Sequence, residues 1–124
     1  ESPYTTEDLN SKNPDSKVAK EKADKSIRPK IKNSVENFSQ YDVVFLGYPI
    51  WWGEAPRIMN TFVESNDFNG KTVIPFVTSG NSEIGTSPNP LKEKTKGAAW
   101  KEGKRFSASS SEADVKKWIK ELGL

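Results

Sequence analysis

Two stretches of the chain carry residue types that suit the binding of a small molecule. Ile50-Trp51-Trp52-Gly53 places two adjacent indoles shortly after an apolar run. Residues 78–87, which follow a second apolar run, are rich in hydroxyl groups and glycine. An indole offers a large face for stacking, and backbone N–H groups and hydroxyls can hydrogen-bond the polar edge of a ring. Together the two stretches favour a flat, partly polar heteroaromatic ligand.

Each stretch also has an ordinary structural interpretation. One of two adjacent indoles often packs beneath its loop, and exposed indoles are a liability unless something covers them. The segment rich in serine and glycine is, taken alone, also compatible with a surface loop. Trp100 and Trp118 are more simply explained as core residues. These residues alone therefore leave open whether the indoles bind a ligand or pack.

The absent residue types limit the chemistry further. The 124 residues include no cysteine and no histidine. Disulfides, thiolate nucleophiles and cysteine metal sites are thereby excluded, as are Ser-His-Asp arrangements and the commonest metal ligand. We therefore expect neither a catalytic side chain nor a metal site, and any reaction would be carried by a cofactor.

Composition predicts one polar domain over residues 1–124. Hydrophobic residues make up 33%, mean hydropathy is −0.76, and 19 basic against 17 acidic residues give a net charge of +2. The lysine-rich stretches are interleaved with acids, which favours solvated faces over a nucleic-acid surface. No apolar run approaches the length of a membrane span, and no signal peptide is visible. We expect a cytoplasmic protein with no nucleic-acid or membrane partner.

The elements that position the two stretches alternate between helix and strand. Apolar runs predict strands at 43–47 and 73–77, although Pro75 is a poor residue for a strand interior because it lacks an N–H. A more polar strand is expected at 103–107. Helices are predicted at 17–25, 29–39 and 89–96 and after Pro56 and Ser111. This order implies a parallel α/β sheet with helices on both faces, and loops after neighbouring parallel strands form a ligand cleft.

A longer pattern resembles a known family. The stretch YDVVFLGYPIWWG at 41–53 is similar to the third strand and flavin loop of small bacterial flavodoxin-like proteins. The similarity continues through FNGKTVIPF at 68–76 and TSGNS at 78–82, and returns in WIKELGL at 118–124. The resemblance implies a flavodoxin-like fold with strand order 2-1-3-4-5 that binds FMN at the strand ends. It also implies electron transfer or quinone-type reduction, together with a redox partner protein.

The resemblance also assigns positions to the flavin. One side of the isoalloxazine would be flanked by Pro49, Ile50, Trp51, Trp52 and Gly53. The other side and the polar edge would be flanked by Thr78, Ser79, Gly80, Asn81 and Gly85.

The family's first strand and its phosphate-binding loop have no counterpart before Tyr4. We therefore expect an incomplete domain that retains the family's strands 3, 4 and 5 and binds FMN weakly. The alternative is a non-catalytic scaffold that binds no flavin and acts through self-association or a partner chain. The strand from Val43 to Gly47 would be an exposed apolar edge, which recruits further strands. We expect a homodimer through this edge, a separate chain that carries the missing half, or an N-terminal segment that folds back over it.

Overall fold

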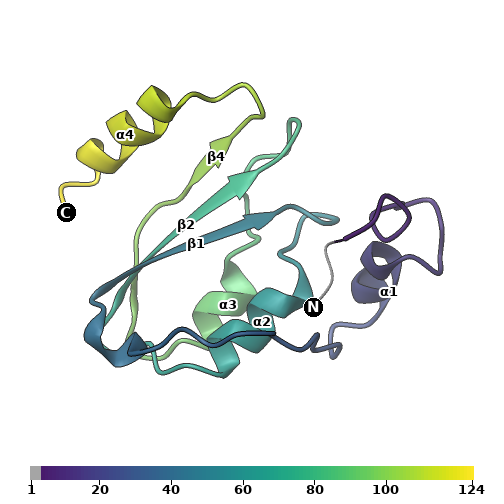
Figure 1. The fold of residues 1–124 in the computed structure, drawn as a ribbon, viewed down its shortest axis with the longest axis horizontal. Helices are drawn as coiled ribbons and strands as arrows, with labels where there is room; N and C mark the ends of the chain where they lie inside the picture. The colour runs from purple at the N-terminus through teal and green to yellow at the C-terminus, as the bar shows by residue number, and fades with distance from the viewer. Residues whose placement is uncertain (1–3) are drawn as a thin grey trace.

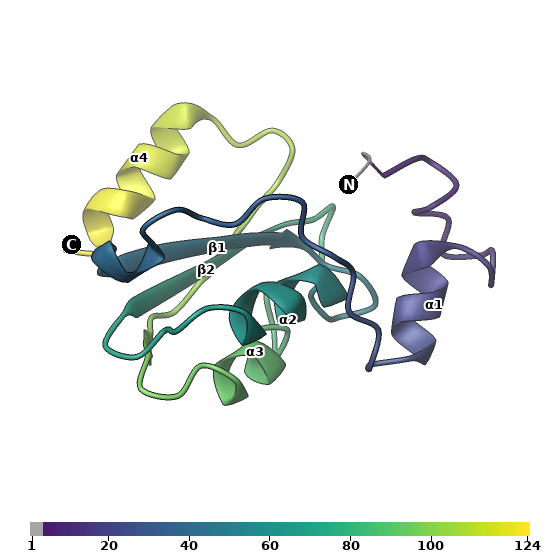
Figure 2. The same cartoon turned by 60° about the horizontal axis from the view of Figure 1, so that its bottom comes forward.

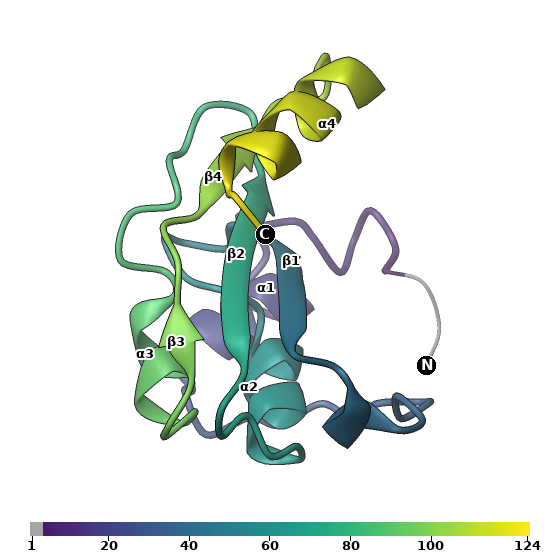
Figure 3. The ribbon, with the colours of Figure 1, turned by 90° about the vertical axis from the view of Figure 1, so that its left-hand side faces the viewer.

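A parallel sheet forms the centre of the computed structural model, which describes residues 4–124 (Figure 1). Strand β1 (Val43–Pro49) pairs with β2 (Thr72–Thr78) along its whole length. Strand β2 also pairs with two short strands, β3 (Ala99–Trp100) and β4 (Lys104–Phe106). Figure 3 shows β1 at the edge of the sheet, where it pairs with no second strand from the described part of the chain.

Helices cover both faces of this sheet, as the alternating pattern predicts (Figure 2). Helices α2 (Arg57–Glu64) and α3 (Asn89–Glu93) lie on one face and α4 (Glu112–Glu121) lies on the other. Helix α1 (Lys17–Ala23) lies beyond the end of the sheet at which β1 ends. None of the helices between residues 4 and 124 is long and apolar enough to cross a bilayer.

Strand alternation divides the core into two layers. The layer beneath α2 and α3 includes Leu46, Val63, Val73 and Val77. The layer beneath α4 is smaller and contains Ile74, Phe106 and Trp118. The lack of a side chain at Gly47 is needed here, because a Cβ atom at this position would clash with the ring of Phe76.

The proline in β2 is accommodated by a break in the neighbouring strand. The N–H of Thr72 donates to the carbonyl of Asp42 on the β1 side (2.8 Å), whereas the carbonyl of Val73 accepts from Lys101 on the other side (2.9 Å). Successive residues of a strand alternate in direction, so the nitrogen of Pro75 faces the same side as Val73. There residues 101–103 interrupt the pairing between β3 and β4. The missing N–H therefore leaves no ladder acceptor unpaired.

The helix predicted at 29–39 is wrong. The structure has only a 3-10 turn, η1 (Phe38–Gln40), at the end of this segment. An amphipathic helix of this length needs a surface on which to bury its apolar stripe, and Val35 is instead 46% exposed. Asn37 also adopts a left-handed conformation (φ 56°), which ends regular helix geometry.

The other predicted helices are present. Ser16 caps α1 by accepting a hydrogen bond from the N–H of Ala19 (3.2 Å). At α4, Ser111 and Asp114 form the expected capping box, with each side chain accepting from the other residue's N–H. Because β1 and β2 are parallel, the turn after β1 and the loop after β2 leave the same end of the sheet.

Candidate functional site

The turn that carries the two indoles is a tight hairpin with a strained tip. The N–H of Trp51 donates to the carbonyl of Glu54 (2.8 Å), and the N–H of Glu54 donates back to Trp51 (3.1 Å). The two residues between them have positive φ angles, 55° at Trp52 and 77° at Gly53. Such turns favour asparagine or glycine at both positions, and a side chain like that of tryptophan costs about 1–2 kcal/mol there. We call residues 50–53 the indole loop.

The strain at Trp52 is not offset by burial of its side chain. Trp52 is 50% exposed. The Nζ of Lys22, from α1, lies 3.7 Å from the centroid of its ring, a cation–π contact. Trp51 is half-buried, and Tyr4 approaches its ring edge-on with a centroid distance of 5.2 Å. An exposed residue in a strained backbone conformation is a common feature of a ligand-contacting position.

A cavity of about 430 Å³ lies against the indole loop. The loop contributes all four of its residues, Ile50, Trp51, Trp52 and Gly53, to the lining. Ser82, from the loop after β2, lines the same cavity. The structure therefore brings the two sequence stretches together at one site, and the volume lies within the range typical of small-molecule pockets.

The N-terminal segment supplies a further wall of the cavity, which was not predicted from the sequence. Leu9, Ser11 and Val18 complete the lining. Val18 is buried, although its helix has only a short apolar face. The signal that could have revealed this wall is the presence of two large aliphatic residues, Leu9 and Val18, in a mostly polar segment.

A buried polar cluster holds this wall in place. The carboxylate of Glu21 accepts a hydrogen bond from the backbone N–H of Arg57 at the start of α2 (2.6 Å). The Arg57 side chain donates to the carbonyl of Glu21 (3.1 Å) and to the carboxylate of Glu54 (2.7 Å). Glu21 and Arg57 are both buried, so the cluster joins α1, α2 and the base of the indole loop. Burial works to raise the pKa of Glu54, but Arg57 and Lys25 outweigh it and leave that pKa below its usual value.

The loop after β2, residues 79–87, is here called the serine loop, and it is fixed near both ends. Near its start, the guanidinium of Arg105 on β4 donates to the Ser79 hydroxyl (3.0 Å) and the Ser79 carbonyl (3.1 Å). At its end, the buried Ser87 hydroxyl hydrogen-bonds the phenol of Tyr48 (3.0 Å). Burial raises the pKa of Tyr48, partly opposed by this hydrogen bond.

The predicted site residues do not all line the cavity. Those of the indole loop do, and Pro49 lies just before them as the last residue of β1. Thr78 is the last residue of β2 and is exposed. The remaining predicted positions lie on the serine loop outside the cavity lining, although Ser82 between them belongs to it: Ser79, Gly80, Asn81 and Gly85.

Comparison with known proteins identifies the family. The flavodoxin family model matches residues 1–122. The chain belongs to the flavodoxin family. No curated protein matches it.

Among solved structures, the chain is similar to a candidate flavoprotein from Bacteroides eggerthii, with 45% identity and a TM-score of 0.86. That match covers 99% of this chain and 77% of the other. A candidate flavoprotein from Bacteroides uniformis is 41% identical with a TM-score of 0.87, and the match covers 96% of this chain and 76% of that one. A flavoprotein from Lactobacillus acidophilus, solved in complex with FMN, shares the fold at 20% identity and a TM-score of 0.51. This third match covers 73% of this chain and 58% of that one.

The residues of this family member fit a flavin ring. The indole loop presents a half-exposed indole beside a cavity. The N–H groups of Gly80 and Asn81 on the serine loop donate to no acceptor in the described part of the chain. A flat ring that carries carbonyl and nitrogen acceptors along one edge would use both features.

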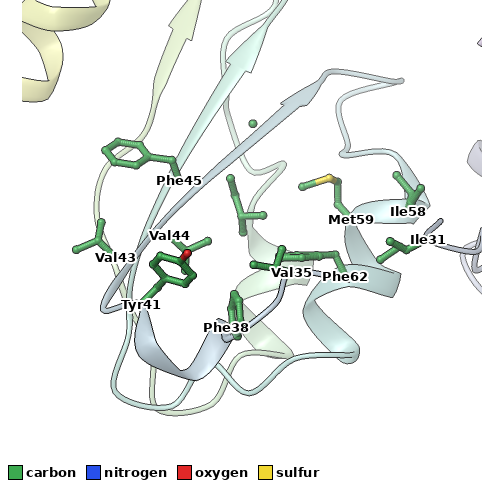
Figure 4. Close-up of a pocket in the computed structure, with 12 residues that line it drawn as sticks. Ile31, Val35, Phe38, Tyr41, Val43, Val44, Phe45, Ile58, Met59 and Phe62 are labelled. Carbon is green, nitrogen blue, oxygen red and sulfur yellow. The ribbon is translucent and has the colours of Figure 1, made fainter. Parts of the chain in front are cut away.

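A second surface feature is an apolar groove along the free edge of β1 (Figure 4). Its volume is about 490 Å³, and its walls come from β1, α2 and the segment before β1. Phe45 on β1 is 39% exposed at this edge. Residues such as Ile31, Val35 and Phe38, which were expected to form a helical stripe, instead line this groove.

Proposed function

We propose that this chain binds FMN through its isoalloxazine ring and acts in electron transfer. The observation that carries the proposal is Trp52, a half-exposed indole at the strained tip of a turn, beside a cavity that the serine loop also reaches. Family membership adds that relatives of this fold are flavoproteins, and one of them is solved with FMN.

The chain's residues would have three tasks in this function. The indole loop would stack against one face of the ring and exclude water from it. The serine loop would donate hydrogen bonds from Gly80 and Asn81 to the polar edge of the ring. The N-terminal segment would close the cavity through Leu9 and Val18. FMN, when bound, supplies the exchange of one or two electrons, so no side chain has to act as acid or base.

The direct test is gel filtration of the protein with excess FMN, followed by a fluorescence titration. We expect flavin absorbance in the protein peak and quenching of both tryptophan and flavin fluorescence. Riboflavin shares the ring but lacks the phosphate, and we expect it to bind within about tenfold of FMN because the proposed contacts address the ring. Colourless protein at millimolar FMN would overturn the proposal and favour a scaffold that binds no flavin.

A matched control separates the indole loop from the other tryptophans. Trp100 lies on β3, which pairs with the opposite end of β2, and its indole N–H donates to the Thr95 hydroxyl (2.8 Å). We expect Trp100→Phe to keep FMN affinity. A variant with Trp52 replaced should bind FMN roughly 5- to 150-fold more weakly.

The free edge of β1 supports a second proposal, self-association. We infer that two copies pair through their β1 edges, since an unpaired apolar strand recruits another and a two-fold axis satisfies both copies at once. Phe45→Glu should then give monomers in analytical ultracentrifugation. Ile119→Glu changes an equally exposed residue on α4 (40% against 39%) and should leave the dimer intact. Wild-type protein that sediments as a monomer at high concentration would contradict this proposal.

A further inference from the structure

Arg105 has an unusual set of partners for an arginine. Its guanidinium donates to the hydroxyl and carbonyl of Ser79 and to the carbonyl of Gly80, all on the serine loop. Within residues 4–124 it forms no ion pair with a carboxylate. The planar fork of an arginine suits several acceptors at fixed angles. Its charge is therefore directed at two successive peptide groups.

These contacts fix the orientation of the two peptide groups. In a trans peptide the C=O and N–H bonds point in opposite directions, and the described chain contains no cis peptide bonds. The carbonyl of Ser79 shares its peptide with the N–H of Gly80, and the carbonyl of Gly80 shares its peptide with the N–H of Asn81. Because Arg105 binds both carbonyls, both N–H groups point away from it.

The two N–H groups have no competing acceptor. Neither Gly80 nor Asn81 donates a backbone hydrogen bond to any described residue. Arg105 lies on β4, and β4 and β1 pair with opposite edges of β2. Both N–H groups belong to the serine loop, whose Ser82 lines the cavity beside the indole loop. The Ser79 hydroxyl also donates to the Ser82 carbonyl, which links this arrangement to a residue of the cavity lining.

We propose that Arg105 is a positioning residue that aims the N–H groups of Gly80 and Asn81 at the polar edge of the bound ring. This inference rests on the proposed FMN function. The positive charge behind the two peptide groups polarises them, which strengthens their N–H groups as donors. Hydrogen bonds to an ionised acceptor are stronger than those to a neutral one. Arg105 therefore favours the reduced flavin, which carries more negative charge on this edge, over the oxidised flavin.

Replacing Arg105 should change both the affinity for FMN and the midpoint potential of bound FMN. Arg105→Gln keeps a polar side chain but loses the charge and the fork. We expect it to weaken the binding of oxidised FMN several-fold. The loss of affinity for reduced FMN should be about tenfold larger than the loss for oxidised FMN. A tenfold difference between the two states lowers the two-electron midpoint potential of bound FMN by about 30 mV. Arg105→Lys keeps the charge and should recover part of the potential.

The experiment has one arm without flavin and one arm with it. In the flavin-free protein, Arg105→Gln should shift the backbone amide signals of Gly80 and Asn81 in a ¹⁵N–¹H NMR spectrum. With FMN, the midpoint potential is measured by reductive titration. Arg28→Gln is the matched control, because Arg28 binds Glu64 on α2 and makes no contact with the serine loop.

The outcomes separate this inference from the function on which it rests. Wild-type protein that binds no FMN overturns the proposed function, and the flavin-free arm still decides whether Arg105 orients the two amides. Unchanged amide signals in Arg105→Gln, or an unchanged potential with FMN bound, would overturn the role of Arg105. If Arg105→Gln fails to fold, Arg105→Lys must show the same amide shifts in weaker form, and the absence of shifts in that variant refutes the role.

Discussion

Replacing Trp52 with asparagine should separate stability from ligand binding. Asparagine is well suited to the first central position of the turn and tolerates a positive φ. The substitution relieves backbone strain of about 1–2 kcal/mol and removes the cation–π contact with Lys22, worth about 0.5–1 kcal/mol at an exposed site. These effects oppose each other. We therefore expect the free energy of unfolding to stay the same or to rise by up to about 1.5 kcal/mol, whereas truncating a tryptophan that packs in a core costs about 3–5 kcal/mol.

Binding of FMN should respond very differently to the same change. Stacking of a base on an aromatic side chain contributes about 1–3 kcal/mol, and a flavin ring is at least as large. A loss of that size corresponds to a fall in affinity of roughly 5- to 150-fold. The strain at Trp52 is then explained as the cost of presenting an indole to the ligand.

Two measurements on the same protein samples check this reasoning. Urea denaturation followed by circular dichroism gives the stability, and flavin fluorescence quenching gives the affinity. Lys22→Met serves as a control, because it removes the cation–π contact and leaves both the indole and the turn in place. A loss of more than about 2 kcal/mol in Trp52→Asn would show that the indole is structural. Unchanged FMN affinity in that variant would refute its role in binding.

Three further substitutions test other parts of the account. Glu21→Ala leaves the buried N–H of Arg57 without an acceptor, so we expect a loss of about 1–3 kcal/mol in urea denaturation, faster proteolysis before residue 24 and weaker FMN binding. Tyr48→Phe should cost about 1 kcal/mol at pH 7. Because the pKa of Tyr48 is raised in the folded state, the stability of the wild type falls as pH rises above the unfolded value of 10.0. The difference in stability between the wild type and Tyr48→Phe should therefore narrow above that pH. A difference that stays constant would contradict the raised pKa. The hydrogen bond from Arg28 lowers the pKa of Glu64 below its usual 4.5, so its stabilisation is present above that pH and is lost on acidification. Acid titration should therefore show the stability advantage of wild type over Glu64→Gln vanishing as pH falls below 4.5.

Local sequence pattern predicted most of the sheet and the helices that cover it. The apolar runs of β1 and β2 were visible because buried parallel strands are apolar on both faces. Helix α4 was visible from its stripe and from the Ser111–Asp114 capping box. The end of the sheet at which the site lies followed from the parallel order alone.

The helix predicted at 29–39 is absent, because the periodicity of apolar residues shows only that a helix there would have an apolar stripe. Whether a helix forms depends on a surface that can bury the stripe, and in this chain the groove beside Val35 stays open. Likewise, Pro75 signalled an irregularity in β2. The compensating break between β3 and β4 lies in another strand and cannot be read from the proline itself.

The parts of the site that the sequence did not predict depend on contacts between distant residues. Glu21 and Arg57 are 36 positions apart, and their pairing places Val18 beside the indole loop. Arg105 binds backbone carbonyls, which every residue possesses, so no residue type in the serine loop marks it as a partner. The strain at Trp52 is a backbone property that becomes visible only in three dimensions.

The central claim is that a flavin ring lies between the indole loop and the serine loop. Titration of FMN into ¹⁵N-labelled protein, followed by NMR, tests it directly. We expect saturable shifts of the Trp52 indole N–H and of the Gly80 and Asn81 amides, while the Trp100 indole stays unchanged. Saturable binding that shifts Trp100 and leaves Trp52, Gly80 and Asn81 unmoved would contradict the claim, as would the absence of any shift at millimolar FMN.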